Sequence, residues 1–236
     1  MEDQANLLPL YEQVRREILA GIETEQFAEG SFLPPEPELM ARYGVSRITI
    51  RRAIGELCGD GRLQRQQGRG TLVMPGKVRQ TLVSLSGFSE TMDGLGRKAS
   101  HRILARTDNP DAPAIRARVQ AEALIRFDRL LEDDGRPMTL ETLWFDAARF
   151  PDVVETVAAG GSFFAALRDK AGIEPAHAER QIDVNLASAS ERAILSVSAA
   201  QPVYRIEKIV TDAEGRPLAL SQLVTPSHLV TYTIKS

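Results

Sequence analysis

Basic side chains are concentrated in one stretch of this 236-residue sequence, and recognition chemistry is expected there first. Nine Lys or Arg residues lie between Arg42 and Arg79, against two acids, Glu56 and Asp60, which gives the stretch a formal charge of +7. The whole chain carries −3 at pH 7. A basic stretch in an acidic chain indicates a surface that binds a polyanion, although a solvated basic face would have the same composition.

Three helices are expected to position these side chains. Apolar residues at helical spacing predict an amphipathic helix over 9–24. A second helix is expected over 36–43, because Gly44 is a typical terminator. Ser46 is placed as the N-cap of a third helix, over 47–57. The apolar residues that define the first and third helices are Leu10, Val14, Ile18, Ile22, Ile50, Ala53, Ile54 and Leu57.

A hairpin follows, with strands expected at 62–66 and 71–74 and a glycine-bearing tip between them. Helix, helix, tight turn, helix and hairpin is the order of a winged helix-turn-helix. The sequence closely resembles the GntR superfamily of bacterial regulators, continuously over about 1–74. The motifs that carry the resemblance are Pro9-Leu10-Tyr11-Glu12-Gln13-Val14, Leu33-Pro34-Pro35-Glu36-Pro37-Glu38-Leu39, Tyr43-Gly44-Val45-Ser46-Arg47 and Gln67-Gly68-Arg69-Gly70-Thr71.

The third helix is interpreted as the recognition helix, whose first turn enters the major groove of DNA. Arg47 can donate two hydrogen bonds to guanine O6 and N7, and Thr49 can reach a base edge or a phosphate. Ser46 and Thr49 could instead only cap and pack, and the two roles can coexist. The wing tip is expected in the minor groove, with arginines on phosphates. The predicted DNA-binding residues are Ser46, Arg47, Thr49, Arg51, Arg52, Arg65, Gln67, Gly68 and Arg69.

Two prolines depart from the family pattern. Pro35 stands where the family usually has a serine that caps the second helix, so the side-chain cap is expected to be lost. Pro37 occupies a position that carries a DNA-contacting arginine in some relatives. The departures put the operator sequence or affinity in question and leave the fold unaffected.

The rest of the chain is expected to be α+β, with a mostly antiparallel sheet. Helices are expected near 86–94, 112–118, 162–171 and 189–195. Two strand pairs are joined by tight turns at Gly135 and Gly215; the shared Gly-Arg-Pro pattern is either an internal repeat or two similar turns. The strands are expected at 100–106, 122–132, 136–145, 178–187, 202–212 and 216–226.

Residues 85–236 resemble the UTRA domain of the HutC-type branch, which is similar in fold to chorismate lyase. The landmarks of the resemblance are Phe88-Ser89-Glu90-Thr91-Met92 with Gly96, Gly135-Arg136-Pro137-Met138-Thr139-Leu140-Glu141, Ser162-Phe163-Phe164 and Gly215-Arg216-Pro217-Leu218-Ala219-Leu220-Ser221. The resemblance implies a domain that binds a small-molecule effector and forms a homodimer. It divides the chain into a DNA-binding domain (1–76), a linker (77–84) and an effector domain (85–236).

Relatives that bind sugar phosphates have an Arg-x-Arg pair, a Glu, a Ser and a C-terminal Tyr. Arg129 matches the first Arg and Glu141 the Glu, whereas Leu131 replaces the second Arg and the Tyr position falls near Leu223 or Val224. These losses favour a carboxylate-bearing effector over a sugar phosphate. Arg129 could instead form a structural salt bridge with Glu141. The predicted effector-binding residues are Phe88, Ser89, Arg129, Glu141, Ser162 and Phe164.

The remaining features narrow the function. The scattered His101, His177 and His228 are expected to be structural or exposed, so neither metal nor cofactor is predicted. No run approaches the roughly 18 apolar residues of a membrane span, and one cysteine, Cys58, fits the cytoplasm. The chain is therefore interpreted as a transcriptional regulator, and the two alternatives are a lyase-like enzyme built on the C-terminal fold and a DNA binder without an effector. As a homodimeric repressor it would bind double-stranded DNA at a palindromic operator.

Overall fold

The computed structural model describes residues 8–81 and 87–233 of the chain. The chain divides into two compact units, Met1–Val78 and Arg79–Ser236, and the division falls inside the segment 77–84 that the sequence suggested as a linker. Each unit has its own hydrophobic core.

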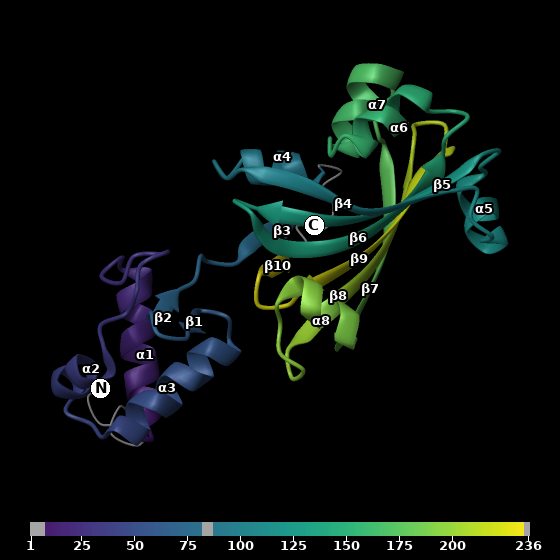
Figure 1. Ribbon diagram of the computed structural model, residues 1–236. Coiled ribbons are helices and arrows are strands. Elements are labelled where there is room, and N and C mark those ends of the chain that lie inside the picture. Colours follow the sequence, from purple (N-terminus) through teal and green to yellow (C-terminus); the bar gives the residue numbers. More distant parts are fainter. Residues whose placement is uncertain (1–7, 82–86, 234–236) are drawn as a thin grey trace. The chain divides into compact units, whose positions relative to one another are not determined.

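The N-terminal unit is three helices followed by a hairpin (Figure 1). The helices are α1 (Leu10–Glu23), α2 (Glu36–Tyr43) and α3 (Arg47–Gly59), and the strands are β1 (Leu63–Gln66) and β2 (Gly70–Val73). Their core buries Val14, Ile18 and Ile22 of α1 and the apolar stripe of α3, as the periodicity predicts, whereas Leu10 is 59% exposed and lies outside the core. The predicted winged helix-turn-helix is confirmed.

Local signals explain where these helices begin and end. Gly44 ends α2 in the left-handed conformation, at φ 64°, which glycine adopts without steric cost. Ser46 caps α3, because its side chain accepts a hydrogen bond from the backbone N–H of Thr49. Pro35 is the N-cap residue of α2 and provides no side-chain hydrogen bond, so the predicted loss of that cap is confirmed.

The C-terminal unit is built on one antiparallel sheet of six strands in the order β4-β5-β6-β9-β8-β7. The tight turns at Gly135 and Gly215 join β5 to β6 and β8 to β9, so both predicted hairpins are confirmed. The strands are β4 (Ala99–Asp108), β5 (Leu124–Asp133), β6 (Arg136–Asp146), β7 (His177–Leu186), β8 (Pro202–Thr211) and β9 (Pro217–Pro226).

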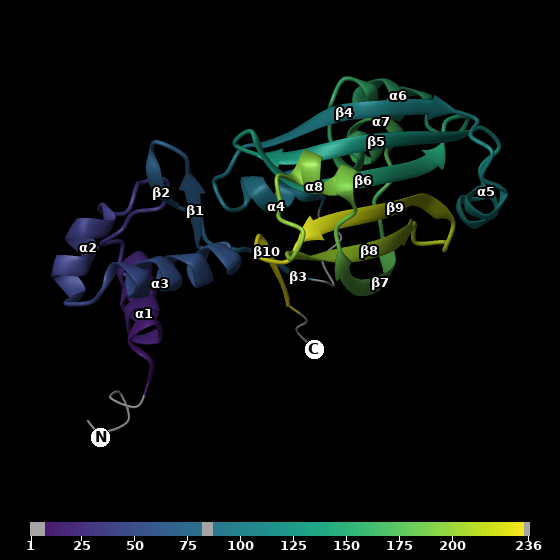
Figure 2. The ribbon, with the colours of Figure 1, turned by 60° about the horizontal axis from the view of Figure 1, so that its bottom comes forward.

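Helices cover both faces of this sheet (Figures 1 and 2). On one face, α6 (Pro151–Ala158) and α7 (Phe163–Ala171) pack over the central strands and enclose the largest core. On the other face, α5 (Pro113–Val119) packs against Leu124, Trp144 and Leu220. The remaining helices are α4 (Phe88–Asp93) and α8 (Ala189–Leu195). The predicted α+β class is confirmed.

One expectation about the fold needs correction. The segment 77–84 is not only a linker, because it contains strand β3 (Val78–Thr81), which pairs with β10 (Val230–Thr233). The partner strand lies some 150 residues later in the sequence, so no local pattern indicates the pairing. Residues 82–84 of the expected linker, and residue 86 of the expected helix 86–94, lie outside the described residues. Helix α6 was not predicted at all.

Candidate nucleic-acid interface and effector site

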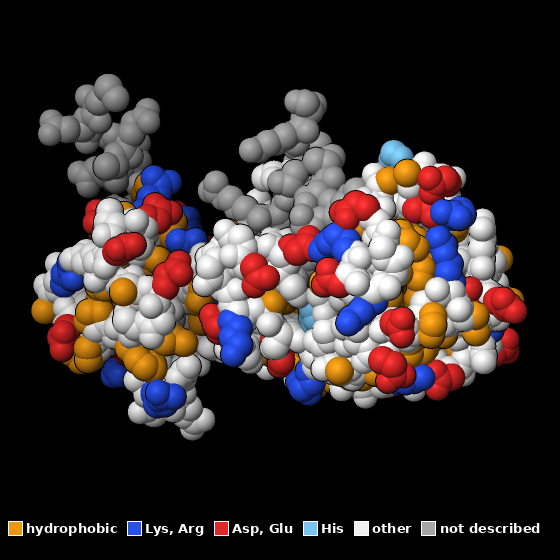
Figure 3. All heavy atoms as spheres, turned by 90° about the horizontal axis from the view of Figure 1, so that it is seen from above, with side chains coloured by type: hydrophobic (Ala, Val, Ile, Leu, Met, Phe, Trp, Pro, Cys, Tyr) orange, Lys and Arg blue, Asp and Glu red, His pale blue; other side chains and the backbone are white. Residues whose placement is uncertain are grey.

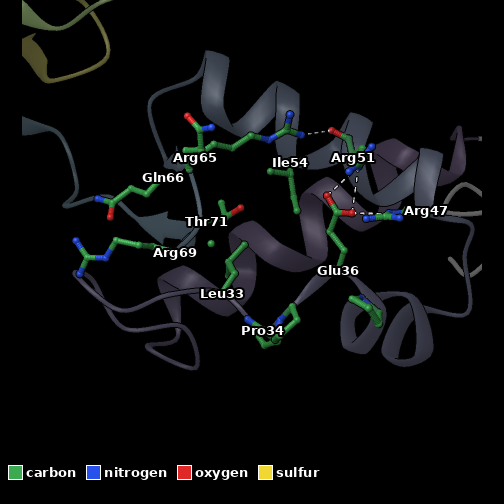
Figure 4. Close-up of a pocket in the computed structure, with 15 residues that line it drawn as sticks. Leu33, Pro34, Glu36, Arg47, Arg51, Ile54, Arg65, Gln66, Arg69 and Thr71 are labelled. Atoms are coloured by element: carbon green, nitrogen blue, oxygen red, sulfur yellow. Dashed lines mark hydrogen bonds and ion pairs between the residues drawn. The ribbon is translucent and has the colours of Figure 1, made fainter.

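A groove of about 740 Å³ opens in the N-terminal unit between the start of α2, the face of α3 and the hairpin β1–β2, called the wing below. Figure 4 shows its lining. Leu33 fixes one wall, because its N–H donates to the carbonyl of Thr71 at 2.8 Å and so ties the chain before α2 to the wing. The charged residues of the lining are Glu36, Arg47, Arg51, Arg65 and Arg69. Four cations against one acid make this groove attractive to a polyanion.

Two arginines of the recognition helix share one carboxylate (Figure 4). Arg47 Nε donates to Glu36 at 2.7 Å, and Arg51 Nε lies 3.0 and 3.1 Å from the two oxygens of the same carboxylate. The arginine side chains remain 61% and 56% exposed. The hydrogen bond from Arg47, and then that from Arg51, lowers the pKa of Glu36 although partial burial opposes the change. The carboxylate is therefore ionised at neutral pH.

The other predicted residues of the recognition helix divide into two groups. The hydroxyls of Ser46 and Thr49 lie 2.9 Å apart at the start of α3, so both are available at the exposed first turn while Ser46 caps. Arg52 lies elsewhere, because its guanidinium stacks 3.7 Å from the ring centroid of Tyr11 in α1. The structure does not bring Arg52 into the groove.

The wing contributes two cations and a glycine tip. Arg65 donates to the backbone carbonyl of Arg51 at 3.0 Å, which links β1 to the recognition helix. Arg69 lies over the ring of Phe32 at 5.4 Å. Gly68 has φ 73°, in the region that favours glycine, and it forms the exposed tip with Gln67. The predicted wing residues therefore all lie along the groove.

The C-terminal unit contains a second set of charges, which is buried. Arg129 of β5 and Glu141 of β6 are directly opposite in the sheet and form an ion pair; their side chains are only 4% and 5% exposed. Arg129 also lies 3.5 Å from the carbonyl of Gly161, just before α7. The salt bridge between Arg129 and Glu141, which the sequence analysis gave as an alternative, is thus present in the structure.

Sequence reasoning missed a lysine beside this pair. Lys208 of β8 has its ammonium 4.6 Å from the ring centroid of Phe164, and burial lowers its pKa to about 8 although the charge of Glu141 opposes the shift. Burial raises the pKa of Glu141, but the positive charges of Arg129 and then Lys208 lower this pKa by a larger amount. The pKa of Glu141 therefore lies below its ordinary value. We call the set Arg129, Glu141, Lys208 and its neighbour Ser221 the buried charge cluster; Lys208 is partly exposed, whereas the other three are 2–5% exposed.

Register explains why Lys208 belongs to the cluster. Lys208 lies opposite Ser221 of β9, and Ser221 lies opposite Leu143 of β6, two residues from Glu141. All of these side chains alternate onto the face that α6 and α7 cover. Only the order of the strands reveals this proximity, because β6 and β8 are separated by more than fifty residues in sequence.

Predicted effector residues from α4 and α7 surround the cluster. Ser89 lies 3.3 Å from Nε2 of His101, and the ring of Phe88 is 6.0 Å from the imidazole. Burial, and then the charge of Arg129, lowers the pKa of His101, so the imidazole is neutral at pH 7. His101 was expected to be structural or exposed, and the structure places it beside the cluster.

Ser162 and Phe164 begin α7 next to the same strands. The side chain of Ser162 caps the helix by accepting from the N–H of Ala165 at 3.3 Å. Phe164 is buried against Gly87, where a Cβ atom would lie 2.9 Å from the phenylalanine ring. The six predicted effector residues come from α4, from the N-terminal end of α7, and from β5 and β6, and the fold gathers them around one face of the sheet.

Two tyrosines lie near Leu223 and Val224, the residues that stand where relatives have a C-terminal Tyr. Tyr204 and Tyr232 pack edge to face with centroids 5.2 Å apart. Tyr232 hydrogen-bonds to Thr225, the residue after Val224. Burial raises the pKa of Tyr232 to about 12. No signal in the sequence connected these residues, because β10 reaches them only through the tertiary fold.

The described residues include no group of three or more His, Cys, Asp or Glu placed to hold a metal ion. Within the same residues, no helix combines the length and apolar character needed to cross a membrane. On the face presented in Figure 3, acidic and basic side chains are interspersed over the surface.

Known proteins match both units. Residues 10–73 match the family described as bacterial regulatory proteins, gntR family, and residues 94–230 match the UTRA domain. The chain is 30% identical over 239 residues to the HTH-type transcriptional regulator YurK of Bacillus subtilis, covering 100% of this chain and 99% of the relative. It is 29% identical to the probable fructoselysine utilization operon transcriptional repressor of Escherichia coli, covering 95% and 93%. The crystal structure of PhnF from Mycobacterium smegmatis aligns with a TM-score of 0.65 at 26% identity, covering 94% and 98%.

Proposed function

This chain belongs to the GntR family of bacterial regulatory proteins and carries a UTRA domain, and from that premise we propose that it represses a catabolic operon until a small anionic metabolite releases it from DNA. It is a DNA-binding transcriptional regulator, as the resemblance implied. The Escherichia coli relative is named as the repressor of an operon, which supports repression as the sign of regulation. The observation that carries the proposal is the groove with four arginines and one acid.

In this proposal the first turn of α3 reads the major groove. The exposed Arg47 donates to a guanine, and the adjacent hydroxyls of Ser46 and Thr49 reach a base edge or a phosphate. The wing tip at Gly68 approaches the minor groove, where the lack of a side chain permits close backbone contact. Arg65 and Arg69 neutralise phosphates, which makes binding strongly dependent on salt.

The effector would be held by the buried charge cluster. Arg129 is partly neutralised by Glu141, so the second cation, Lys208, is what gives the cluster a net positive charge for an anion. Leu131 replaces the second arginine of sugar-phosphate-binding relatives, so Arg129, Glu141 and Lys208 together leave one net positive charge. One net positive charge matches a singly charged carboxylate better than a phosphate, which carries nearly two negative charges near pH 7.

A homodimer fits both parts of the proposal. A two-fold symmetric protein binds a palindromic operator with one recognition helix in each half-site. The effector would release DNA if it bound more tightly to the state in which the two recognition helices no longer match the half-site spacing.

The experiment uses the full chain and a random-sequence library of duplexes. Repeated selection should enrich a two-fold symmetric sequence, and fluorescence anisotropy then measures its dissociation constant with a panel of small carboxylates, sugar phosphates and inorganic phosphate. We expect a carboxylate to weaken binding at least tenfold, and Lys208→Met to abolish that effect without changing the affinity for DNA alone. Failure to enrich any sequence would overturn DNA regulation; release only by sugar phosphates would overturn the effector class.

A further inference from the structure

We propose that Glu36 is a positioning residue for base recognition: its carboxylate holds Arg47 and Arg51 by their Nε atoms, so that both guanidinium groups present their Nη ends to DNA in a fixed orientation. This inference rests on the proposed operator binding and deepens it, because Glu36 is not among the predicted DNA-binding residues.

The hydrogen-bonding pattern supports positioning. Both arginines use Nε toward Glu36, at 2.7 Å for Arg47 and 3.0 Å for Arg51. Within the described part of the chain, neither arginine donates a hydrogen bond from its Nη groups to another residue. These donors therefore remain available to DNA. Two adjacent Nη groups are the pair of donors that can bind guanine O6 and N7 together. The carboxylate therefore binds the Nε atom of each guanidinium and leaves both Nη groups for base recognition.

Exposure explains why such a clamp is useful. An arginine that is more than half exposed samples many rotamers, and ordering it on DNA costs roughly 0.5–1.5 kcal/mol per side chain. One carboxylate with two oxygens restrains both arginines before DNA arrives. Glu36 itself is only 25% exposed, so it is the better-ordered member of the three.

The backbone at Glu36 is unusually restrained. Pro34, Pro35 and Pro37 flank it, and each proline fixes its own φ. The preceding Leu33 is hydrogen-bonded to the wing. The prolines that break the family pattern therefore present Glu36 rigidly at the first turn of α2, where the helix dipole also favours an acid.

Electrostatics argues against a simple affinity role. Glu36 is the one acid among the five charged residues of the groove lining, and DNA phosphates would repel it. An acid here lowers general attraction to DNA while it orients the two groups that read bases. The expected signature is a change in the ratio of specific to nonspecific affinity, with little change in folding.

The test compares Glu36→Gln and Glu36→Ala with Glu38→Gln in the full chain. Glu38 is an exposed acid in the same turn of α2, so its variant removes the same charge without touching the two arginines. The probes are the duplex enriched by the wild-type chain and a scrambled duplex of equal length. Anisotropy gives both dissociation constants at several salt concentrations, and circular dichroism monitors folding.

Glu36→Ala should lower the specificity ratio about tenfold, the size of one lost bidentate contact, with tighter binding to the scrambled duplex. Glu36→Gln keeps an acceptor but loses the charge and should fall between Glu36→Ala and wild type, while Glu38→Gln stays within about twofold of wild type. A ratio unchanged in Glu36→Ala, or changed equally in Glu38→Gln, overturns the positioning role. If the wild-type chain enriches no duplex, the proposed function itself has failed, which is a different result.

Discussion

The two units each contain an arginine–glutamate cluster, and the surroundings of the two clusters differ. In the N-terminal unit, Glu36 binds Arg47 and Arg51 at the rim of an open groove, where both arginines are more than half exposed. In the C-terminal unit, Arg129 and Glu141 pair across β5 and β6 under α7, almost without exposure. Arginine–glutamate ion pairs are thus exposed to solvent in the N-terminal unit and buried in the C-terminal unit.

Exposure decides what each cluster can do. An exposed pair contributes about 0–1 kcal/mol to stability and exchanges partners easily, so its arginines can turn to DNA. A buried pair must remain satisfied, because an unpaired charge under the sheet would cost several kcal/mol. We expect substitutions in the first cluster to change binding and substitutions in the second to change folding.

The largest expected effect is on the buried cluster. Arg129→Met should lower the free energy of unfolding by about 3–5 kcal/mol, because it leaves Glu141 buried without its main partner. Urea unfolding can be followed by the fluorescence of Trp144, the single tryptophan of the chain, which is buried in this unit. Arg129→Met combined with Glu141→Leu should recover most of the loss. Arg47→Met is the exposed control; its unfolding is followed by circular dichroism, because Trp144 lies in the other unit. A loss below about 1 kcal/mol for Arg129→Met would contradict the comparison.

The next effect is on DNA affinity. Arg47→Ala should weaken binding to the enriched duplex by about 1–3 kcal/mol, or roughly 5- to 150-fold, because a bidentate contact to guanine is lost. Arg52→Ala is the matched control on the same helix, since Arg52 stacks on Tyr11 outside the groove. Anisotropy measures both. Equal losses in the two variants would show that charge alone, and not position at the groove, governs binding.

Helix caps provide a smaller comparison between the units. Ser46→Ala removes the cap of α3, and Ser188→Ala removes the capping box of α8 that also involves Glu191. Each should cost about 0.5–2 kcal/mol in thermal unfolding by circular dichroism, because each loses the hydrogen bond that its hydroxyl accepts from a backbone N–H of the first turn, while the backbone N–H of Ser188 keeps its bond to Glu191. Ser46→Ala should weaken DNA binding less than Arg47→Ala. The reverse order would assign Ser46 a dominant contact with DNA.

The smallest expected effect is a pH dependence at Lys208. Its pKa of about 8 lies below the ordinary 10.5, so between these values the unfolded chain binds more protons than the folded chain, and this group makes stability rise with pH. Lys208→Met should therefore gain most stability, relative to wild type, at pH 7 and lose that gain toward pH 10. Urea unfolding at pH 7, 8.5 and 10 tests the trend. A difference between the two proteins that does not vary with pH would mean that the surroundings of Lys208 do not lower its pKa.

The groove could be predicted well from the sequence. The helices and wing of the N-terminal unit follow from local periodicity, from Gly44 and from Ser46, and a helix-turn-helix with its hairpin spans few residues. Arg47, Arg51 and the wing arginines were found because their spacing along one short segment fixes their positions. The role of Glu36 was missed, because its partners lie 11 and 15 residues away on another helix.

The buried charge cluster depended on information that the sequence does not display. Strand alternation placed Arg129 on one face of β5, and the resemblance identified Glu141. Lys208 joins them only because β9 inserts between β6 and β8, and β3 is a strand only because β10 pairs with it. The sequence by itself determined the helices and wing of the N-terminal unit, most elements of the C-terminal unit and the family. The tertiary structure decided which distant charges share a buried site, because pairing between strands far apart in the chain depends on the whole sheet and not on local backbone preference.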